Sequence, residues 1–524
     1  MGLFSFKPET KKEVALKWIT IPLTMILVMI VGAPVNLPNY YKEAKNPYSD
    51  IIRFSSLAGQ YLVIIPGFLC KRGIQRCVME ISSIVLALSY CILGSLDKFQ
   101  IGIIGFDAAI ISFACFLANL ASTLVIFIAI SLCISNYSHE EDLLLPIIIA
   151  AHLVTAGEFD ENIKHLLFNF NEDFQMSLFF FITGGYVGIC SLLLSLTIER
   201  RTIKSFLVQW FSPDTFGVTL FVLYCALFIE VLVASQIIEG NYPMTVAVFI
   251  IGWLIYLYIP YFFRRIILDQ GVKLKGFKMT KVVREVSLSK CLKDSKFQLM
   301  CVLSAVIKGT SLTTVHYIKD IGVILRKYHE VEHLEKSYWI VAVSAVFLGG
   351  ILVVFFRKSI HAYFFLCIAP FLCIFGFYYF LGASYGLISV IIPQIILFGG
   401  GHQDFVQTWG FIYLCDLFGI IAMDLIVRAI LLWNYQYNLL VYFGVCAFVN
   451  LILFIACIRK YCQRKLARKE IKKQKKAKKE KKKKLKETNK NPKKHKNTTP
   501  LKPKTKRKKS FNALNLDTSP KLKI

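Results

Sequence analysis

The chain has 524 residues, 56% of them hydrophobic, with a mean hydropathy of +0.56; soluble domains are about 45–50% apolar, so a soluble globular protein is excluded. The formal net charge is +29, but residues 459–524 alone hold 29 basic and 4 acidic side chains. The body of the chain is therefore nearly balanced in charge, which excludes a nucleic-acid-binding function based on overall basicity.

The apolar residues gather in runs of about 17–25 residues, long enough to cross a hydrocarbon core of roughly 30 Å as α-helices. These runs lack the strict alternation of barrel strands, and only helices and closed barrels satisfy their own backbone groups in lipid. We therefore predict an all-α membrane protein with about 14 transmembrane helices. The predicted helices span 18–36, 51–70, 77–96, 103–134, 143–158, 177–198, 216–238, 244–264, 297–316, 337–356, 361–381, 384–415, 418–434 and 438–458.

One part of the second half allows two interpretations. The polar stretch from Gly399 to Gln407 either ends one helix or lies inside a long helix. In both cases the second half contains six crossings, so the predicted number of helices does not depend on the choice.

Alternate loops of the chain are basic, and lysine and arginine are retained on the cytosolic side of membrane proteins. The basic loops lie before the first helix, at 71–76, at 200–204, at 264–296, at 357–358 and in the C-terminal tail. The acidic segment 138–142 also falls on the predicted cytosolic side, but acidic residues count little in this rule. We therefore expect both termini to be cytosolic.

This pattern predicts two six-helix bundles, as in a duplicated transporter body. The predicted parts are a cytosolic N-terminus (1–17), an N-terminal bundle (18–198), two linking helices (216–264), a basic cytosolic loop (265–296), a C-terminal bundle (297–458) and a Lys-rich cytosolic tail (459–524).

The tail contains the lysine-rich runs 481–484 and 506–509 amid Asn, Thr and Pro. Such a segment cannot bury enough apolar surface to fold, so we predict a disordered tail. An alternative is that residues 459–487 extend the last span as a basic helix. Anionic inner-leaflet lipids attract such charges by about 1 kcal/mol per basic residue, so these lipids are the predicted partner. A tail that only aids solubility is the other interpretation, and no nucleic-acid partner is expected.

The segment from Pro66 to Arg76 follows the second helix and contains Gly67, Arg72 and Gly73. It resembles the loop signature of the major facilitator superfamily, which reads Gly, an apolar pair, Asp, base, Gly and base. Here the acidic residue is missing and the spacing is one residue shorter. In the superfamily that acid helps to hold the outward-open arrangement. The resemblance therefore implies a gating loop in which gating differs or another group takes the role of the acid.

Two segments of the second half carry the same resemblance. Residues 309–322 resemble the family's first C-terminal helix, with His316 and Tyr317 where the family often has Asp-Asn. Residues 398–419 are similar to the family's long fourth C-terminal helix, which ends in an acidic residue, an apolar residue, Phe and Gly. With the layout of six, two and six helices, residues 15–460 resemble the nodulin-like branch of the superfamily. This implies a secondary transporter.

Ionisable side chains inside membrane spans are costly and mark functional sites by default. Asp107 lies near the start of the fourth helix, and Glu230 lies inside the seventh, outside the two bundles. Asp424 and Arg428 are four residues apart on one helix face and are predicted to form an ion pair. A structural pair is the first interpretation and a proton relay the second.

Lys308 and His316 lie eight residues apart on the ninth helix, on neighbouring faces. The corresponding helix lines the cavity in the resembled fold. A lysine favours an anionic solute, and a histidine can take a coupling proton near neutral pH. The other predicted residues of the substrate path are polar groups at mid-span: Asn119, His402, Gln403 and Asp404.

His329, Glu330 and His333 match the HExxH pattern of zinc proteases. The pattern lies in a charged, non-cytosolic loop, and no third ligand follows it. No nucleotide-binding GxxxxGK[ST] loop occurs either. We therefore predict no enzyme activity, no metal site and no cofactor.

The sequence thus predicts a multi-pass secondary transporter of a small polar or anionic solute. It would work by alternating access between its two bundles and draw on a solute or proton gradient. The alternative is a non-transporting membrane scaffold or receptor that keeps the fold, which the degenerate loop signature and the long tail permit.

Overall fold

The computed structural model describes most of the helical body of the chain. The described residues are 23–25, 27–28, 30–38, 41, 48–64, 67–68, 74–99, 104–136, 144–153, 176–197, 207–209, 278–280, 288–317, 338–350, 359–375, 378–400, 405–433 and 438–490.

The first half consists of apolar helices. In chain order the described elements are η1 (Ala33–Asn36), α3 (Ser49–Tyr61), α5 (Gln75–Phe99), α6 (Ile104–Asn136), the short helix Leu144–Leu153 and α8 (Met176–Thr197). Pro34 lies at the start of η1, where a missing backbone N–H has little cost. The long helix α6 has a single charged residue, Asp107, in its first turn, so no charge interrupts the rest of its length.

The second half is also helical. Its described elements are α11 (Leu288–Leu292), α12 (Ser295–His316), the short helix Tyr338–Gly350, α15 (Ser359–Ile374), α16 (Tyr378–Gly400), α17 (Phe405–Trp433) and α18 (Asn438–Lys490). Asp294 caps α12, because its carboxylate accepts a hydrogen bond of 3.1 Å from the backbone N–H of Lys296. Between the halves, β1 (Leu207–Gln209) pairs antiparallel with β2 (Lys278–Thr280).

Seven of the described helices are long and apolar enough to cross a membrane. They contain the spans Gln75–Leu96, Phe106–Ile134, Ser177–Leu196, Ser295–His316, Tyr378–Leu397, Phe405–Ala429 and Val441–Gln463. Large apolar side chains such as Phe113, Phe418 and Phe448 are exposed on these helices. Exposed apolar surface of this extent suits contact with lipid tails rather than water. The chain is a multi-pass integral membrane protein.

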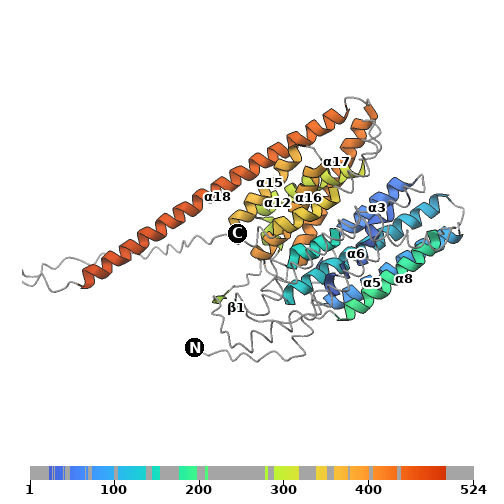
Figure 1. Ribbon diagram of the computed structural model, residues 1–524, viewed down its shortest axis with the longest axis horizontal. Helices are drawn as coiled ribbons and strands as arrows, with labels where there is room; N and C mark the ends of the chain where they lie inside the picture. Colours follow the sequence, from blue (N-terminus) through green and yellow to red (C-terminus); the bar gives the residue numbers. More distant parts are fainter. Residues whose placement is uncertain are drawn as a thin grey trace, which may run out of the picture. The chain divides into compact units, whose positions relative to one another are not determined.

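The helices pack into two groups. In the first group α6 packs against α3 and α5, and α5 packs against α8; in the second, α12 packs against α16 and α17, and α15 packs against α16. Figure 1 shows them as the blue-to-green and the yellow-to-orange helices. The groups meet where α17 contacts α3 and α6. They also meet where Gly350 lies directly against the ring of Pro146.

Two predicted helix breaks in the second half differ from the structure. The sequence predicts breaks near 382 and 416, whereas α16 begins at Tyr378 and α17 runs unbroken from Phe405 to Trp433. The predicted break near 416, where the helix of the resembled family ends, is wrong: Asp416 is enclosed by neighbouring helices, and α17 continues through it. Gly399 and Gly400 end α16, as one of the two interpretations has it, and glycine is a poor helix former.

The predicted helices 216–238 and 244–264 lie outside the described residues, so fourteen crossings remain a prediction. The described helix α18 continues to Lys490. This differs from the disorder predicted from residue 459 and agrees with the alternative of a basic helix over 459–487. The lysine, glutamate and alanine of this segment are good helix formers. Residues 491–524 lie outside the described part.

Candidate functional site

Lys308 of α12 and Asp416 of α17 form an ion pair. The Lys308 Nζ donates a hydrogen bond of 2.8 Å to Oδ2 of Asp416. The two side chains are enclosed, with 5% and 0% of their surface exposed. The same ammonium group lies 4.3 Å from the ring centroid of Tyr413, which is a cation–π contact.

Small residues allow α12 and α17 to approach closely beside this pair. A Cβ placed on Gly309 would lie 2.6 Å from the backbone oxygen of Gly419, and a Cβ placed on Gly419 would collide with the backbone oxygen of Ala305. Such close crossings between small residues are typical of membrane helices. Gly309 follows Lys308 directly, and Gly419 lies three residues after Asp416, so this crossing keeps the two charged side chains within reach of each other.

Side chains of the first half reach the same place. Tyr413 packs against Tyr61 of α3, with ring centroids 5.3 Å apart, and against Phe127 of α6, at 4.7 Å. His152, at the end of the short helix before α8, lies within electrostatic range of Lys308. The ion pair is therefore located where the two groups of helices meet.

Asp424 is the centre of a second charge cluster, eight residues further along α17. Its Oδ1 accepts hydrogen bonds from Nη1 of Arg53 (2.9 Å) and from the hydroxyl of Tyr317 (3.1 Å). Its Oδ2 accepts a bond of 2.8 Å from Nε of Arg428. Arg428 also forms two contacts, of 3.0 and 3.1 Å, with the carboxylate of Asp50. We call these residues (Asp50, Arg53, Tyr317, Asp424 and Arg428) the Asp424 cluster. Because Asp50 and Arg53 belong to α3, the Asp424 cluster links the two groups of helices.

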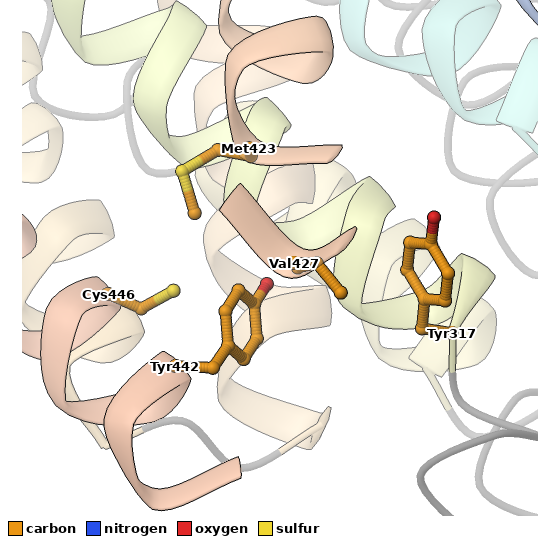
Figure 2. Packing of buried hydrophobic residues seen from close by; sticks show 5 residues of the cluster. All are labelled: Tyr317, Met423, Val427, Tyr442 and Cys446. Atoms are coloured by element: carbon orange, nitrogen blue, oxygen red, sulfur yellow. The ribbon is translucent and has the colours of Figure 1, made fainter. Parts of the chain in front are cut away.

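Apolar side chains pack beside the Asp424 cluster. They are Tyr317, Met423, Val427, Tyr442 and Cys446, from the end of α12, from α17 and from α18 (Figure 2). Asp424 has no exposed side-chain surface, whereas Arg428 is 32% exposed and Asp50 is 59% exposed. The cluster therefore extends from the enclosed interior to the surface.

Several enclosed polar atoms on the helices around the Lys308–Asp416 pair have no hydrogen-bond partner within the described part of the chain. They are Oδ1 of Asp416, Nδ1 of His152, Oε1 of Gln407 and the hydroxyl oxygen of Thr313. An unpaired buried polar group costs about 1–3 kcal/mol, so such atoms usually bind water or a ligand. Oδ1 of Asp416 at the junction of the two groups of helices is therefore available to pair with a water molecule or a polar solute.

The structure separates the two residues predicted on the ninth helix. Lys308 is enclosed at the junction, whereas His316 ends α12, where its ring lies 5.0 Å from that of Tyr317. Asn119 is buried on α6, and its amide nitrogen donates a hydrogen bond of 3.1 Å to the backbone oxygen of Pro34. Asn119 thus ties α6 to η1 and does not contact Lys308.

The other ionisable residues that the sequence predicts inside membrane helices, and that the structure describes, lie at separate positions. Asp424 and Arg428 lie 2.8 Å apart, as their spacing predicts. Asp107 lies in the first turn of α6, and its Oδ1 has no partner among the described residues.

The predicted gating loop is described at its two ends. A Cβ on Gly67 would lie 3.2 Å from Cα of Gln407 in α17, so this glycine faces the other group of helices. Arg76 forms an ion pair of 2.9 Å with Glu80 and donates a bond of 3.2 Å to the backbone oxygen of Leu196.

The remaining predicted residues stay predictions, because they lie outside the described part of the chain. They are Arg72, Gly73, Glu230, His402, Gln403 and Asp404, together with the HExxH pattern at 329–333. Among the described residues, no three His, Cys, Asp or Glu side chains form a group that could hold a metal ion.

The sequence prediction missed the partner of Lys308. Asp416 stood between two predicted helices and was assigned to a helix end rather than to a membrane interior. The apolar run from 405 to 433 contains only three charged residues, Asp416, Asp424 and Arg428, and this is the signal that locates all three on one helix. Arg53 lay inside a predicted helix without being singled out.

No protein-family model matches the sequence, and no curated protein matches it. Among solved structures, the E. coli fucose:proton symporter FucP gives a TM-score of 0.46 at 10% identity, over 84% of this chain and 98% of its own. XylE, a proton:xylose symporter of the major facilitator superfamily, solved with 6-bromo-6-deoxy-D-glucose, gives 0.49 at 10% identity, over 85% and 95%. A double-tryptophan variant of XylE gives 0.50 at 9% identity, over 84% and 95%. The chain has the fold of the major facilitator superfamily.

Proposed function

We propose that the chain is a secondary transporter that carries a small polar or anionic solute across a membrane by alternating access. One observation carries this proposal: an enclosed ion pair, Lys308–Asp416, with an unpartnered carboxylate oxygen, lies at the junction of the two groups of helices. Ionisable residues in membrane spans mark solute and ion paths. In duplicated transporters the solute binds at the junction of the repeats.

A proton gradient is the proposed energy source. XylE, whose fold the chain shares, is a proton:xylose symporter. A lysine at the junction favours an anionic group on the solute, and the carboxylate beside it can change its protonation state.

The Asp424 cluster is the proposed gate on one side of the membrane. It joins α3 to α17 through the Arg53–Asp424 and Arg428–Asp50 ion pairs. The basic loop at 71–76 supports a cytosolic location for the opposite end of α3, so the cluster would close the non-cytosolic side. The ion pairs must separate when that side opens.

The layout of six, two and six predicted helices supports two six-helix bundles and the nodulin-like branch of the superfamily. We propose cytosolic termini, and a tail whose basic residues contact anionic inner-leaflet lipids. A chain that lacks residues 465–524 should then change in localisation or activity. Unchanged behaviour would favour a tail that only aids solubility.

Reconstitution tests the transport function. The full-length protein is placed in liposomes, and uptake of a broad panel of labelled solutes is measured with and without a pH gradient. At least one solute should accumulate in protein-containing liposomes and not in empty ones. A folded protein that moves no solute of the panel but binds a partner protein would be a scaffold instead.

A further inference from the structure

We propose that the Lys308–Asp416 pair binds the solute through a carboxylate group and that Asp416 takes up one proton with each solute molecule. This inference rests on the proposed transport function. It adds the chemical class of the solute and the group that carries the proton.

The pair has unused bonding capacity on both sides. A lysine ammonium has three N–H donors, and the described residues give Lys308 one acceptor, Oδ2 of Asp416. Oδ1 of Asp416 has no hydrogen-bond partner among them. The hydroxyl of Ser304 lies within hydrogen-bonding range of the Asp416 carboxyl group. Lys308 can therefore bind a second carboxylate, and Asp416 has an oxygen that can hold a proton.

Asp424, on the same helix, provides the contrast. Both of its oxygens are occupied, by Arg53, Tyr317 and Arg428. A saturated carboxylate between two arginines suits the helix-to-helix contact of the proposed gate and has no free oxygen for a solute or a proton. Asp416 is bonded to a single cation through a single oxygen. A solute carboxylate can therefore replace Asp416 as the partner of Lys308.

Charge balance decides what happens when a carboxylate solute arrives. If the solute takes the ammonium group of Lys308, Asp416 loses its counter-ion and faces a second negative charge in an enclosed site. An uncompensated buried charge is strongly disfavoured, and a neighbouring like charge favours protonation of a carboxylate. Asp416 therefore gains a proton from the aqueous phase. The site holds no net charge before or after binding, so one anion and one proton cross together.

Among the described residues, no second cation lies beside Asp416. The titratable side chains within electrostatic range of it, from α3, α12, α16 and α17, are Tyr61, Cys301, Lys308, Tyr385, Tyr413 and Cys415. His152 faces Lys308 from the first half. Among the described residues, Lys308 is thus the cation beside Asp416. A single cation matches one carboxylate, whereas phosphate sites usually use several donors or an arginine fork.

Matched solutes test the carboxylate. Liposomes that contain the full-length protein receive one solute at a time: L-lactate, its amide lactamide, succinate, its amide succinamide, or D-xylose. A pH dye is trapped in the lumen, and valinomycin with K⁺ clamps the membrane potential. We expect at least tenfold faster uptake of a carboxylate than of its amide. Uptake of a monocarboxylate should acidify the lumen by one proton per solute and should not depend on the potential.

Asp416→Asn tests the proton carrier. Without a group that accepts the proton, the variant should carry the anion alone: luminal acidification should disappear, and uptake should become dependent on the membrane potential. Glu470→Gln, at an exposed position on α18, should behave as the wild type. If the variant does not fold, the number of protons that the wild type takes up per carboxylate tests the proposal by itself.

Three outcomes would overturn the inference while leaving a transporter. They are equal uptake of lactate and lactamide, proton-coupled uptake of D-xylose without any carboxylate uptake, and proton coupling that persists in Asp416→Asn. Absence of flux for every solute would instead overturn the transport function, and this inference with it.

Discussion

Lys308 and Asp416 place two opposite charges inside an apolar helix pair, with almost no exposed surface. Removing charges from water is expensive, and their mutual attraction offsets this cost only while both partners are present. A buried pair is therefore weak evidence for stability as such. Its presence at the junction of the two groups of helices supports the solute site proposed above.

The pair predicts an asymmetry between single and double substitutions. Lys308→Met should lower the free energy of unfolding, by at most about 3–5 kcal/mol, because Asp416 loses its counter-ion and must either stay buried as an unpaired charge or take up a proton. The double variant Lys308→Met/Asp416→Leu removes both charges and should recover most of that loss, yet transport nothing. Thermal unfolding in detergent checks this, with exposed Lys293→Ala as the control. A double variant as unstable as the sum of the single variants would contradict it.

At the scale of the helix, some of the ion pairs join neighbouring turns of one helix, and others join helices that are far apart in the sequence. The Asp424–Arg428 pair follows from a spacing of four residues on one helix, and the sequence predicted it. Lys308 and Asp416 are 108 residues apart in the chain, and the Asp424–Arg53 pair spans 371 residues. These pairs depend on which helices pack together, and no spacing in the sequence contains that information.

Helix ends in the second half show the same limit. The family resemblance placed a helix end near residue 416, but α17 continues through it, and Lys308 neutralises the charge of Asp416 there. The apolar runs themselves predicted the existence of the helices well, since their length depends only on local composition.

The crossing of α12 and α17 depends on Gly309 and Gly419. Gly419→Leu should push the two helices apart, lower the unfolding temperature and abolish transport, because its Cβ would collide with the backbone of Ala305. Gly444→Leu on α18 is the matched control, since no heavy atom lies within 4 Å of a Cβ placed there. Equal unfolding temperatures for the two variants would show that the close crossing is not needed.

At the scale of the whole molecule, α17 contacts α3 and the residues that follow it at three levels of the junction. Arg53 pairs with Asp424 at one level, the ring of Tyr61 packs on Tyr413 at the next, and Gly67 faces Gln407 at the third. In a structure that alternates between two open states, the first and third contacts cannot both persist throughout the cycle. The ion pairs of the Asp424 cluster are the contacts expected to break when their side opens.

The distance between α3 and α17 beside the Asp424 cluster therefore tests alternating access directly. Spin labels are attached to an unnatural amino acid at Ile51 and at Leu425, which are both exposed. This labelling leaves the native cysteines in place. The distribution of distances between the two labels is measured by pulsed electron paramagnetic resonance in lipid nanodiscs. We predict two populations, and a shift of the wild-type distribution toward the longer distance in Arg53→Gln, which removes an ion pair of the gate. A single population that Arg53→Gln leaves unchanged would contradict a transporter working by alternating access and would favour a static scaffold.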